Sequence, residues 1–177
     1  MEQGINRDIV ADTQVAVLMG GLGTRLGLKD RPKAMADIQG RPFFEYQLKL
    51  LRRWGFRKFL FLVGYRADCI EGYFGDGSKW QADIRYSYDG QEQMGTGGAL
   101  KNAEDKLEED FLLIYGDSFM DIDYQETVYR YYMEKAEGKS GIMAILRNED
   151  HYDKSNVVYQ DGKLLLYDKV NISDSMR

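Results

Sequence analysis

The sequence predicts an α/β protein in which helices cover both faces of a mostly parallel, twisted sheet. Two observations predict it: short, fully apolar runs alternate with segments of helical periodicity, and glycines directly follow several of these runs. Continuous apolar runs are typical of strands buried on both faces of a parallel sheet, and their alternation with helices implies right-handed βαβ crossovers. We therefore expect the loops at the carboxyl ends of the strands to carry the ligand site.

Each element follows from a local signal. The apolar run 15–19, which two glycines end, predicts the first strand. Behind Pro42, apolar residues at i, i+4 and i+7 predict a helix over 43–53, and Gly55 ends it. An Asp-Gly pair at 161–162 suits a two-residue type I′ turn. By the same signals we expect strands at 58–63, 84–88, 111–115 and 142–146, helices at 67–74, 95–107 and 128–136, and a hairpin of 157–160 with 163–168.

The bulk composition excludes several classes of protein. A net charge of -5 and a single histidine argue against a nucleic-acid-binding surface and a histidine-rich metal site. The lone Cys69 excludes an internal disulfide and a multi-cysteine zinc site. The longest apolar runs are far shorter than the roughly 20 residues that span a bilayer. The polar residues 1–14 lack the apolar core of a signal peptide. We expect a cytoplasmic protein with neither a membrane nor a nucleic acid as partner.

A glycine-rich loop follows the first predicted strand. Gly20, Gly21 and Gly23 permit positive φ, so that several N–H groups can converge on phosphate oxygens. The loop lacks the spacing of a Walker A loop and of the dinucleotide fingerprint. A tight strand-to-helix connection explains such a loop equally well. Arg25 and Lys33 favour a polyphosphate site, because they add a planar fork of donors and a point charge.

These residues carry a family resemblance. LxGGLGTRL at residues 18–26 followed by RPKxM at 31–35 resembles the signature of the sugar-phosphate nucleotidylyltransferases, and the likeness is strongest to heptose-1-phosphate guanylyltransferase-like enzymes. It continues in the family's order through FFEY at 43–46, VGY at 63–65, YFGDG at 73–77, MGTGGA at 94–99 and YGD at 115–117. The resemblance implies a Rossmann-like nucleotide-diphospho-sugar transferase fold. It also implies transfer of a nucleotidyl group from a nucleoside triphosphate to a sugar 1-phosphate.

The resemblance implies roles at the phosphates. The glycine loop, with Thr24 and Arg25, would hold the triphosphate, and Lys33 would reach the α-phosphate. Because the attacking sugar phosphate is already an anion, catalysis needs positioning and charge neutralisation rather than a base. Asp117 ends a buried strand at the ligand edge and resembles the family's Mg²⁺-binding aspartate, although a loop carboxylate that caps a turn is the alternative. We assign no role to the neighbouring Asp121 and Asp123.

A second glycine cluster is expected at the nucleobase. Gly95, Thr96 and Gly97 open a helix, whose free N–H groups suit a phosphate or the edge of a base; the resemblance implies the base. Glu92 is a natural acceptor for the N1–H and amino groups of guanine, which favours guanosine over uridine. The glutamines that flank Glu92 would serve a pyrimidine equally well.

The sugar site is expected near the end of the chain. Asp168 and Lys169 resemble the family's acid–lysine pair, in which the acid contacts sugar hydroxyls and the lysine contacts the sugar phosphate. Aspartate replaces the family's glutamate, and Asn156 stands where many relatives have glycine, so we expect an unusual sugar. A solvated strand end is the alternative reading of the pair.

We expect one domain over residues 1–177. Residues 1–14 would form a polar extension, 15–120 the nucleotide-binding core, and 121–177 the start of the sugar-binding part, whose C-terminal portion would be truncated because family members continue further. The missing part normally carries a second metal-binding aspartate, so a nucleotide-binding or regulatory module without full catalysis is the alternative function. A Rossmann-like oxidoreductase is disfavoured, because the second strand ends in Val-Gly-Tyr-Arg at 63–66 rather than in an acid for the ribose. A homo-oligomer is left open.

Overall fold

The computed structural model describes residues 9–21, 30–90, 94–147, 151, 154–168 and 171. The chain divides into two compact units, Met1–Glu137 and Gly138–Arg177, which are described separately. The organisation as one domain with the bounds given above stays a prediction.

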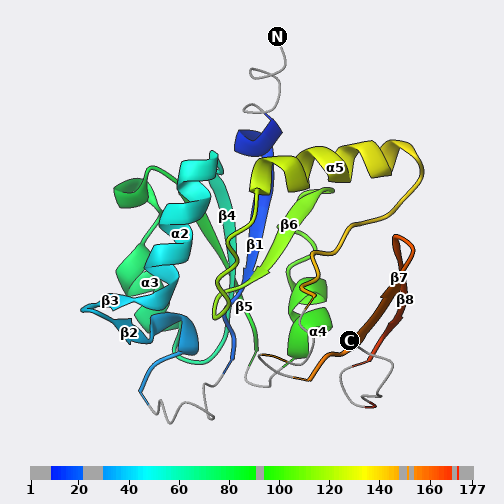
Figure 1. Ribbon diagram of the computed structural model, residues 1–177. Coiled ribbons are helices and arrows are strands. Elements are labelled where there is room, and N and C mark those ends of the chain that lie inside the picture. Colours follow the sequence, from blue (N-terminus) through cyan, green and yellow to red (C-terminus); the bar gives the residue numbers. More distant parts are fainter. Residues whose placement is uncertain are drawn as a thin grey trace. The chain divides into compact units, whose positions relative to one another are not determined.

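The first unit is built on a parallel sheet. Its four strands lie in the order β5-β4-β1-β6, and every neighbouring pair is parallel (Figure 1). The strands are β1 (Gln14–Leu18), β4 (Lys58–Val63), β5 (Asp83–Tyr88) and β6 (Phe111–Tyr115). All four coincide with predicted strands to within one residue at each end, which confirms the expected parallel α/β sheet.

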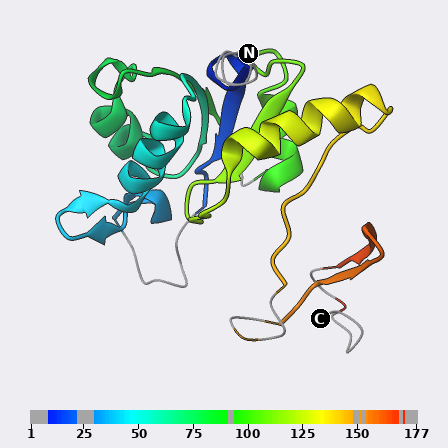
Figure 2. The same ribbon diagram turned by 45° about the horizontal axis from the view of Figure 1, so that its top comes forward.

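Helices cover both faces of this sheet (Figures 1 and 2). They are α2 (Phe43–Trp54), α3 (Ala67–Phe74), α4 (Gly95–Asn102) and α5 (Tyr124–Ala136). On one face, side chains of α2, α3 and α5 pack in a single apolar cluster with alternate residues of the strands. On the other face, Ala99 and Ala103 at α4 pack against Ala16, Leu60 and Leu62. The central strands β1 and β4 are apolar at nearly every position because both of their faces are buried, whereas the edge strand β5 alternates between buried and exposed residues.

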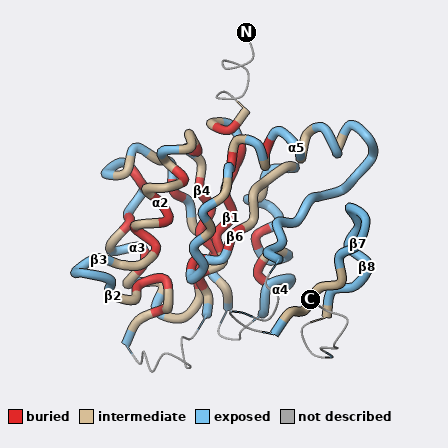
Figure 3. Tube along the Cα trace, viewed as in Figure 1, coloured by how far each residue is buried: buried red, intermediate tan, exposed pale blue. Residues whose placement is uncertain are grey.

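The burial pattern follows the same division (Figure 3). Buried residues concentrate in β1 and β4, the two central strands, where Val15, Val17 and Phe61 have no exposed surface. On α2, Phe44 contacts Phe61 edge to face, with ring centroids 5.2 Å apart. Val10, in the helical segment 9–12, is only 1% exposed, so the buried core begins before residue 15.

Four short elements lie outside the predicted ones. The 3₁₀ turn η2 (Lys33–Met35) and the antiparallel pair β2 (Asp37–Ile38) and β3 (Arg41–Pro42) connect the phosphate loop to α2, and η3 (Ser78–Trp80) precedes β5. Elements of two or three residues carry no hydrophobic period, so the sequence contained no signal for them. The predicted helix 95–107 also ends earlier, at Asn102.

The second unit contains the predicted hairpin. Strands β7 (Val157–Gln160) and β8 (Lys163–Tyr167) pair antiparallel, and Asp161 and Gly162 have φ of 51° and 79°, as a type I′ turn requires. The strand predicted at 142–146 is wrong: residues 141–147 are irregular, and Leu146 is 72% exposed. Within the described part of the chain no strand pairs with this segment, and an apolar run becomes a strand only where it is paired and half-buried.

Candidate active site

Four loops meet at the carboxyl edge of the parallel sheet. The backbone pairing continues one residue past three of the strands: Met19 N donates to Leu62 O at 2.8 Å, Asp89 N to Val63 O at 2.7 Å, and Gly116 N to Leu18 O at 2.9 Å. These bonds fix the first residue of three of the loops. The four loops begin with Met19, Gly64, Asp89 and Gly116.

The strand order places a topological switch point at this edge. From β1 the chain adds β4 and then β5 on one side and returns to place β6 on the other. Connections leave such a point in opposite directions, so a crevice opens there, and ligands of open α/β sheets bind in it. The crevice holds a pocket of about 350 Å³, within the usual size of small-molecule sites. The pocket is lined by Leu18, Met19, Gly20, Gly21, Lys33, Ala34, Asp89, Met94, Gly95, Thr96, Ala99, Tyr115, Gly116 and Asp117.

Lys33 and Asp117 lie together in this pocket. Lys33 begins η2 directly behind Pro32, and Asp117 follows β6, so two residues 84 positions apart form an ion pair of 3.2 Å. Their side chains are 29% and 38% exposed. An ion pair with that much solvent contact contributes little to folding stability. Its position therefore has more bearing on ligand binding than on the fold.

The beginning of α4 forms another wall. Gly95 and Thr96 line the pocket, and the N-cap Met94 makes no side-chain capping bond. The first N–H groups of a helix have no partner within the helix, so they remain able to bind a ligand. Across the pocket, Thr96 Oγ1 lies 3.4 Å from the hydroxyl of Tyr115. Gly97 is exposed in the same turn but is not among the lining residues.

The structure gives a different reason for a glycine at position 20. The sequence predicts positive φ for the glycine loop, but neither Gly20 nor Gly21 has a positive φ. A Cβ at Gly20 would instead lie 2.8 Å from Asp89 Oδ2. A side chain at residue 20 would thus displace the Asp89 carboxylate, whereas a side chain at Gly21 would meet nothing within 4 Å.

Asp89 is the pocket residue that sequence reasoning missed. Its side chain is half-buried, its Oδ1 is shielded from solvent, and no described residue bonds that atom. Burial raises the pKa of the Asp89 carboxyl. The available signal was its position: Asp89 directly follows a strand at the ligand edge, which is the same criterion that selected Asp117.

Several predicted site residues lie outside the described part of the chain: Gly23, Thr24, Arg25, Glu92 and Lys169. In the second unit, Asp168 N donates to Asn156 O at 3.1 Å, so the two predicted sugar-site residues adjoin. The Asp168 carboxylate accepts bonds from the backbone and side-chain nitrogens of Asn171, both at 3.0 Å. It therefore also closes a turn, and its role toward a sugar stays a prediction.

Asp117 is the pocket carboxylate that the sequence predicts as a cation ligand. Asp123 is occupied as the N-cap of α5, where its side chain accepts from Glu126 N at 2.8 Å. Within the described residues, no group of three or more potential ligands gathers at one point. A cation at Asp117 would thus need oxygens from a phosphate ligand. Mg²⁺ is commonly held in this way, by one or two carboxylates and substrate phosphates, so the donor set fits it.

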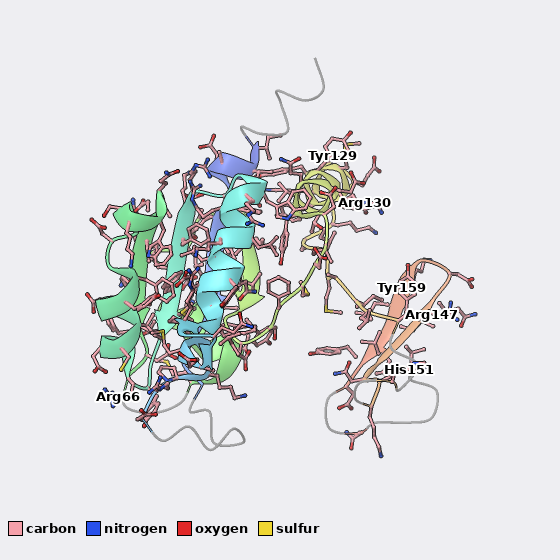
Figure 4. All side chains as sticks on the ribbon, turned by 60° about the vertical axis from the view of Figure 1, so that its left-hand side comes forward. Arg66, Tyr129, Arg130, Arg147, His151 and Tyr159 are labelled. Carbon is pink, nitrogen blue, oxygen red and sulfur yellow. The ribbon has the colours of Figure 1, made fainter. Side chains whose placement is uncertain are left out.

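The carboxyl end of β4 is where a dinucleotide-binding site would carry an acid for the ribose, and the nearest acid there is Asp68. At the carboxyl end of β4, Arg66 projects from the unit's surface (Figure 4). It holds the Asp68 carboxylate with two bonds, of 3.0 and 3.1 Å. Because that carboxylate already has a partner, it is poorly placed to receive a ribose hydroxyl. This disfavours the oxidoreductase reading further.

A switch-point pocket that combines a lysine, a carboxylate and a helix amino terminus is typical of α/β proteins that bind phosphorylated ligands. Comparison with known proteins gives the family. The family model described as nucleotidyl transferase matches residues 14–155, so the chain belongs to the nucleotidyl transferase family.

Individual relatives agree with this assignment. The chain is 34% identical over 163 residues to D-glycero-alpha-D-manno-heptose 1-phosphate guanylyltransferase of Campylobacter jejuni, covering 89% of this chain and 69% of that protein. It is 30% identical to UTP--glucose-1-phosphate uridylyltransferase AglF of Haloferax volcanii, covering 81% and 57%. The crystal structure of HddC from Yersinia pseudotuberculosis complexed with GMP-PN is 32% identical, with a TM-score of 0.57 and coverage of 70% and 54%. The chain thus spans little more than half of two of these relatives.

In the described part of the chain, no helix is long and apolar enough to cross a membrane.

Proposed function

We propose that the protein transfers a nucleotidyl group from a nucleoside triphosphate to a sugar 1-phosphate, forming a nucleotide-sugar and pyrophosphate. The pairing of Lys33 with Asp117 at the switch point carries this proposal, because it gathers the two charge types that a polyphosphate and its cation need. The names of the relatives support the reaction type. They differ in base and sugar, so these names leave both substrates open.

The reaction places limited demands on the protein. An oxygen of the sugar phosphate attacks the α-phosphorus in line, and the bond from that phosphorus to the bridging oxygen of the β-phosphate breaks as pyrophosphate leaves. The nucleophile is already an anion, so no side chain needs to remove a proton. Lys33 would hold the α-phosphate and neutralise the charge that develops on it. The loop at Gly20 and Gly21 would hold the triphosphate, and the N–H groups at the start of α4 would orient the base.

We assign the cation site to Asp117 and propose Mg²⁺ as its occupant. When bound, the cation would neutralise phosphate charge and align the triphosphate. Lys33 and the cation would then share the carboxylate of Asp117, since the lysine occupies one of its oxygens at 3.2 Å. In the second unit, Asn156, Asp168 and Lys169 remain the proposed contacts of the sugar phosphate.

The Lys33→Ala variant tests the assignment. Purified chain, Mg²⁺, each nucleoside triphosphate and a panel of sugar 1-phosphates are combined, and released pyrophosphate is measured. We expect Lys33→Ala to lower kcat about 10²-fold or more, because it removes a group that stabilises transition-state charge. Lys139→Ala, a change of the same charge at an exposed residue outside the pocket, is the control and should leave the rate unchanged.

Two results would change the conclusion. An unaltered rate in Lys33→Ala would refute the role of the pocket in transfer. Absence of pyrophosphate with every substrate pair, together with micromolar nucleotide binding, would leave the alternative of a nucleotide-binding or regulatory module. For the cation, Asp117→Asn should weaken Mn²⁺ binding measured by electron paramagnetic resonance in the presence of nucleotide, and equal binding would remove Asp117 from the cation site.

A further inference from the structure

A basic groove lies at the edge of the sheet opposite the candidate active site. Helix α2 runs back from the carboxyl edge, so it ends at the amino edge, where Lys58 begins β4 (Figure 1). The length of β4, about 17 Å, separates the two edges. Four of the seven residues that line the groove are cations and none is an acid, in a chain of net charge -5. The groove has a volume of about 310 Å³ and is lined by Leu48, Lys49, Arg52, Arg53, Arg57, Trp80 and Gln81.

The end of α2 accounts for only part of this positive charge. Helix carboxyl ends attract cations, because their last carbonyl groups carry a partial negative charge. Arg52 donates from Nη1 to Phe56 O at 2.5 Å and from Nε to Trp80 O at 2.9 Å. Arg57 Nη1 donates to the carbonyl oxygens of residues 52, 55 and 56 at 3.3, 3.1 and 3.1 Å. Each guanidinium carries five N–H groups, so both arginines retain donors for a ligand.

These bonds fix the two guanidinium groups without neutralising them. Their acceptors are carbonyl oxygens, and no ion pair among the described residues includes Arg52 or Arg57. Arg53 forms neither a hydrogen bond nor an ion pair with any residue that the structure describes. Lys49, Arg52 and Arg53 also lie at i, i+3 and i+4 on one face of α2, where like charges repel one another. The fold therefore gathers positive charge here at a cost in stability.

The acids closest to the groove serve other partners. Glu45 on α2 accepts from Lys49 and from the hydroxyl of Tyr73, so it balances the charge of the lysine. Asp83, at the start of β5, pairs with Arg85 at 3.2 Å. The charge of the three groove arginines thus remains available to an anion from solution.

We propose that this groove binds the phosphate groups of a small phosphorylated molecule. A guanidinium presents its donors in a planar fork that matches phosphate oxygens, and donors that are already held in place lose little freedom on binding. A concave site suits a compact ligand. The net negative charge of the chain would repel a long polyanion, so a small ligand is favoured over a nucleic acid. This site is separate from the candidate active site and does not depend on nucleotidyl transfer.

Pyrophosphate is a suitable probe, because it consists of two phosphate groups. Its binding is measured by calorimetry without Mg²⁺, in the full chain carrying Lys33→Ala, which weakens competing binding at the candidate active site. Adding Arg53→Gln should lower the affinity about 10- to 100-fold, because charge-assisted hydrogen bonds are lost. Arg53 bonds no described residue, so this change should leave the fold intact, which circular dichroism checks. Arg53→Lys keeps the charge without the fork and should give an intermediate affinity.

Trp80 reports whether the probe binds in the groove. The chain contains two tryptophans, so Trp54→Phe leaves Trp80 as the only one. The Nζ atoms of Lys79 and Lys49 lie 4.9 and 5.9 Å from the Trp80 ring. An anion that draws these cations away should change the tryptophan emission. We expect a saturable change over the same pyrophosphate concentrations that calorimetry reports.

Arg130→Gln is the matched control, since it removes an equal charge from an exposed arginine of α5 outside the groove. Equal pyrophosphate affinities of the Arg53→Gln and Arg130→Gln variants would overturn the proposal. Absence of binding at millimolar pyrophosphate would overturn it as well. Binding to phosphatidic acid vesicles that pyrophosphate does not displace would assign the charge to a membrane surface instead of a small ligand. Each of these results leaves nucleotidyl transfer standing, because that proposal is tested by pyrophosphate release.

Discussion

Gly77→Ala is expected to destabilise the first unit through one close backbone contact. Gly77 has φ of 88°, and a Cβ there would lie 2.5 Å from the carbonyl oxygen of Ala82 and 2.7 Å from Ile84 Cγ1. Neither neighbour can withdraw freely: Ala82 N bonds Gly77 O at 3.0 Å, and Ile84 N bonds Asp76 O at 2.9 Å. These bonds hold the start of β5, and Asp89 of the pocket follows the other end of this strand.

The magnitude has two parts. A left-handed backbone costs a residue with a Cβ about 1–2 kcal/mol. Overpacking against a neighbour that cannot move adds about 1–3 kcal/mol. The free energy of unfolding should thus fall by about 2–5 kcal/mol. For a chain of this size each kcal/mol lowers the melting temperature by about 2–4 °C, so Gly77→Ala should melt about 4–20 °C below the unaltered protein.

Gly40→Ala separates the two parts. Gly40 has φ of 79°, nearly the same backbone, but a Cβ there would meet nothing within 4 Å. This control should lose only the conformational part, about 1–2 kcal/mol. Both variants are followed by circular dichroism during heating and during urea unfolding. Equal losses in Gly77→Ala and Gly40→Ala would show that the Ala82 carbonyl does not approach as closely as the structure places it.

Two further predictions concern the N-terminal cap of α5 and the loss of stability at low pH. Asp123→Ala removes the side-chain cap of α5 and should cost about 1 kcal/mol in urea unfolding, while Asp121→Ala changes an exposed residue and should stay within about 0.5 kcal/mol; equal effects would contradict the cap. Burial raises the pKa of Glu45, but hydrogen bonds from Lys49 and Tyr73 outweigh it, so the pKa lies below its ordinary value of 4.5. The contribution of Glu45 is therefore complete above pH 4.5 and is lost as pH falls through the lower folded-state pKa. Melting temperatures of Glu45→Gln should depend less on pH below this value, and parallel curves for the two proteins would argue against the assigned bonds.

Local signals determined most elements, and the failures have a physical cause. Apolar runs predicted β1, β4 and β6, alternation predicted β5, and helical spacing with glycine ends predicted the positions of α2 and α3, because burial leaves a pattern in the sequence of each element. The run 142–146 has the composition of a strand but is irregular in the structure. Strand formation depends on a paired neighbour, and composition does not show whether one exists.

The sequence by itself determined the parallel α/β class, the family, and the charged residues Lys33 and Asp117, because each is marked by a motif or by its place after a strand. Only the tertiary structure decided that these two residues form an ion pair across 84 positions of chain. It also decided that Gly20 leaves room for a neighbouring carboxylate rather than adopting a positive φ, and that Asp89 Oδ1 is buried without a hydrogen bond from any described residue. The physical reason is that pairing and burial are relations between residues distant along the chain. A motif identifies which groups are present, whereas the strand order β5-β4-β1-β6 determines which of them meet.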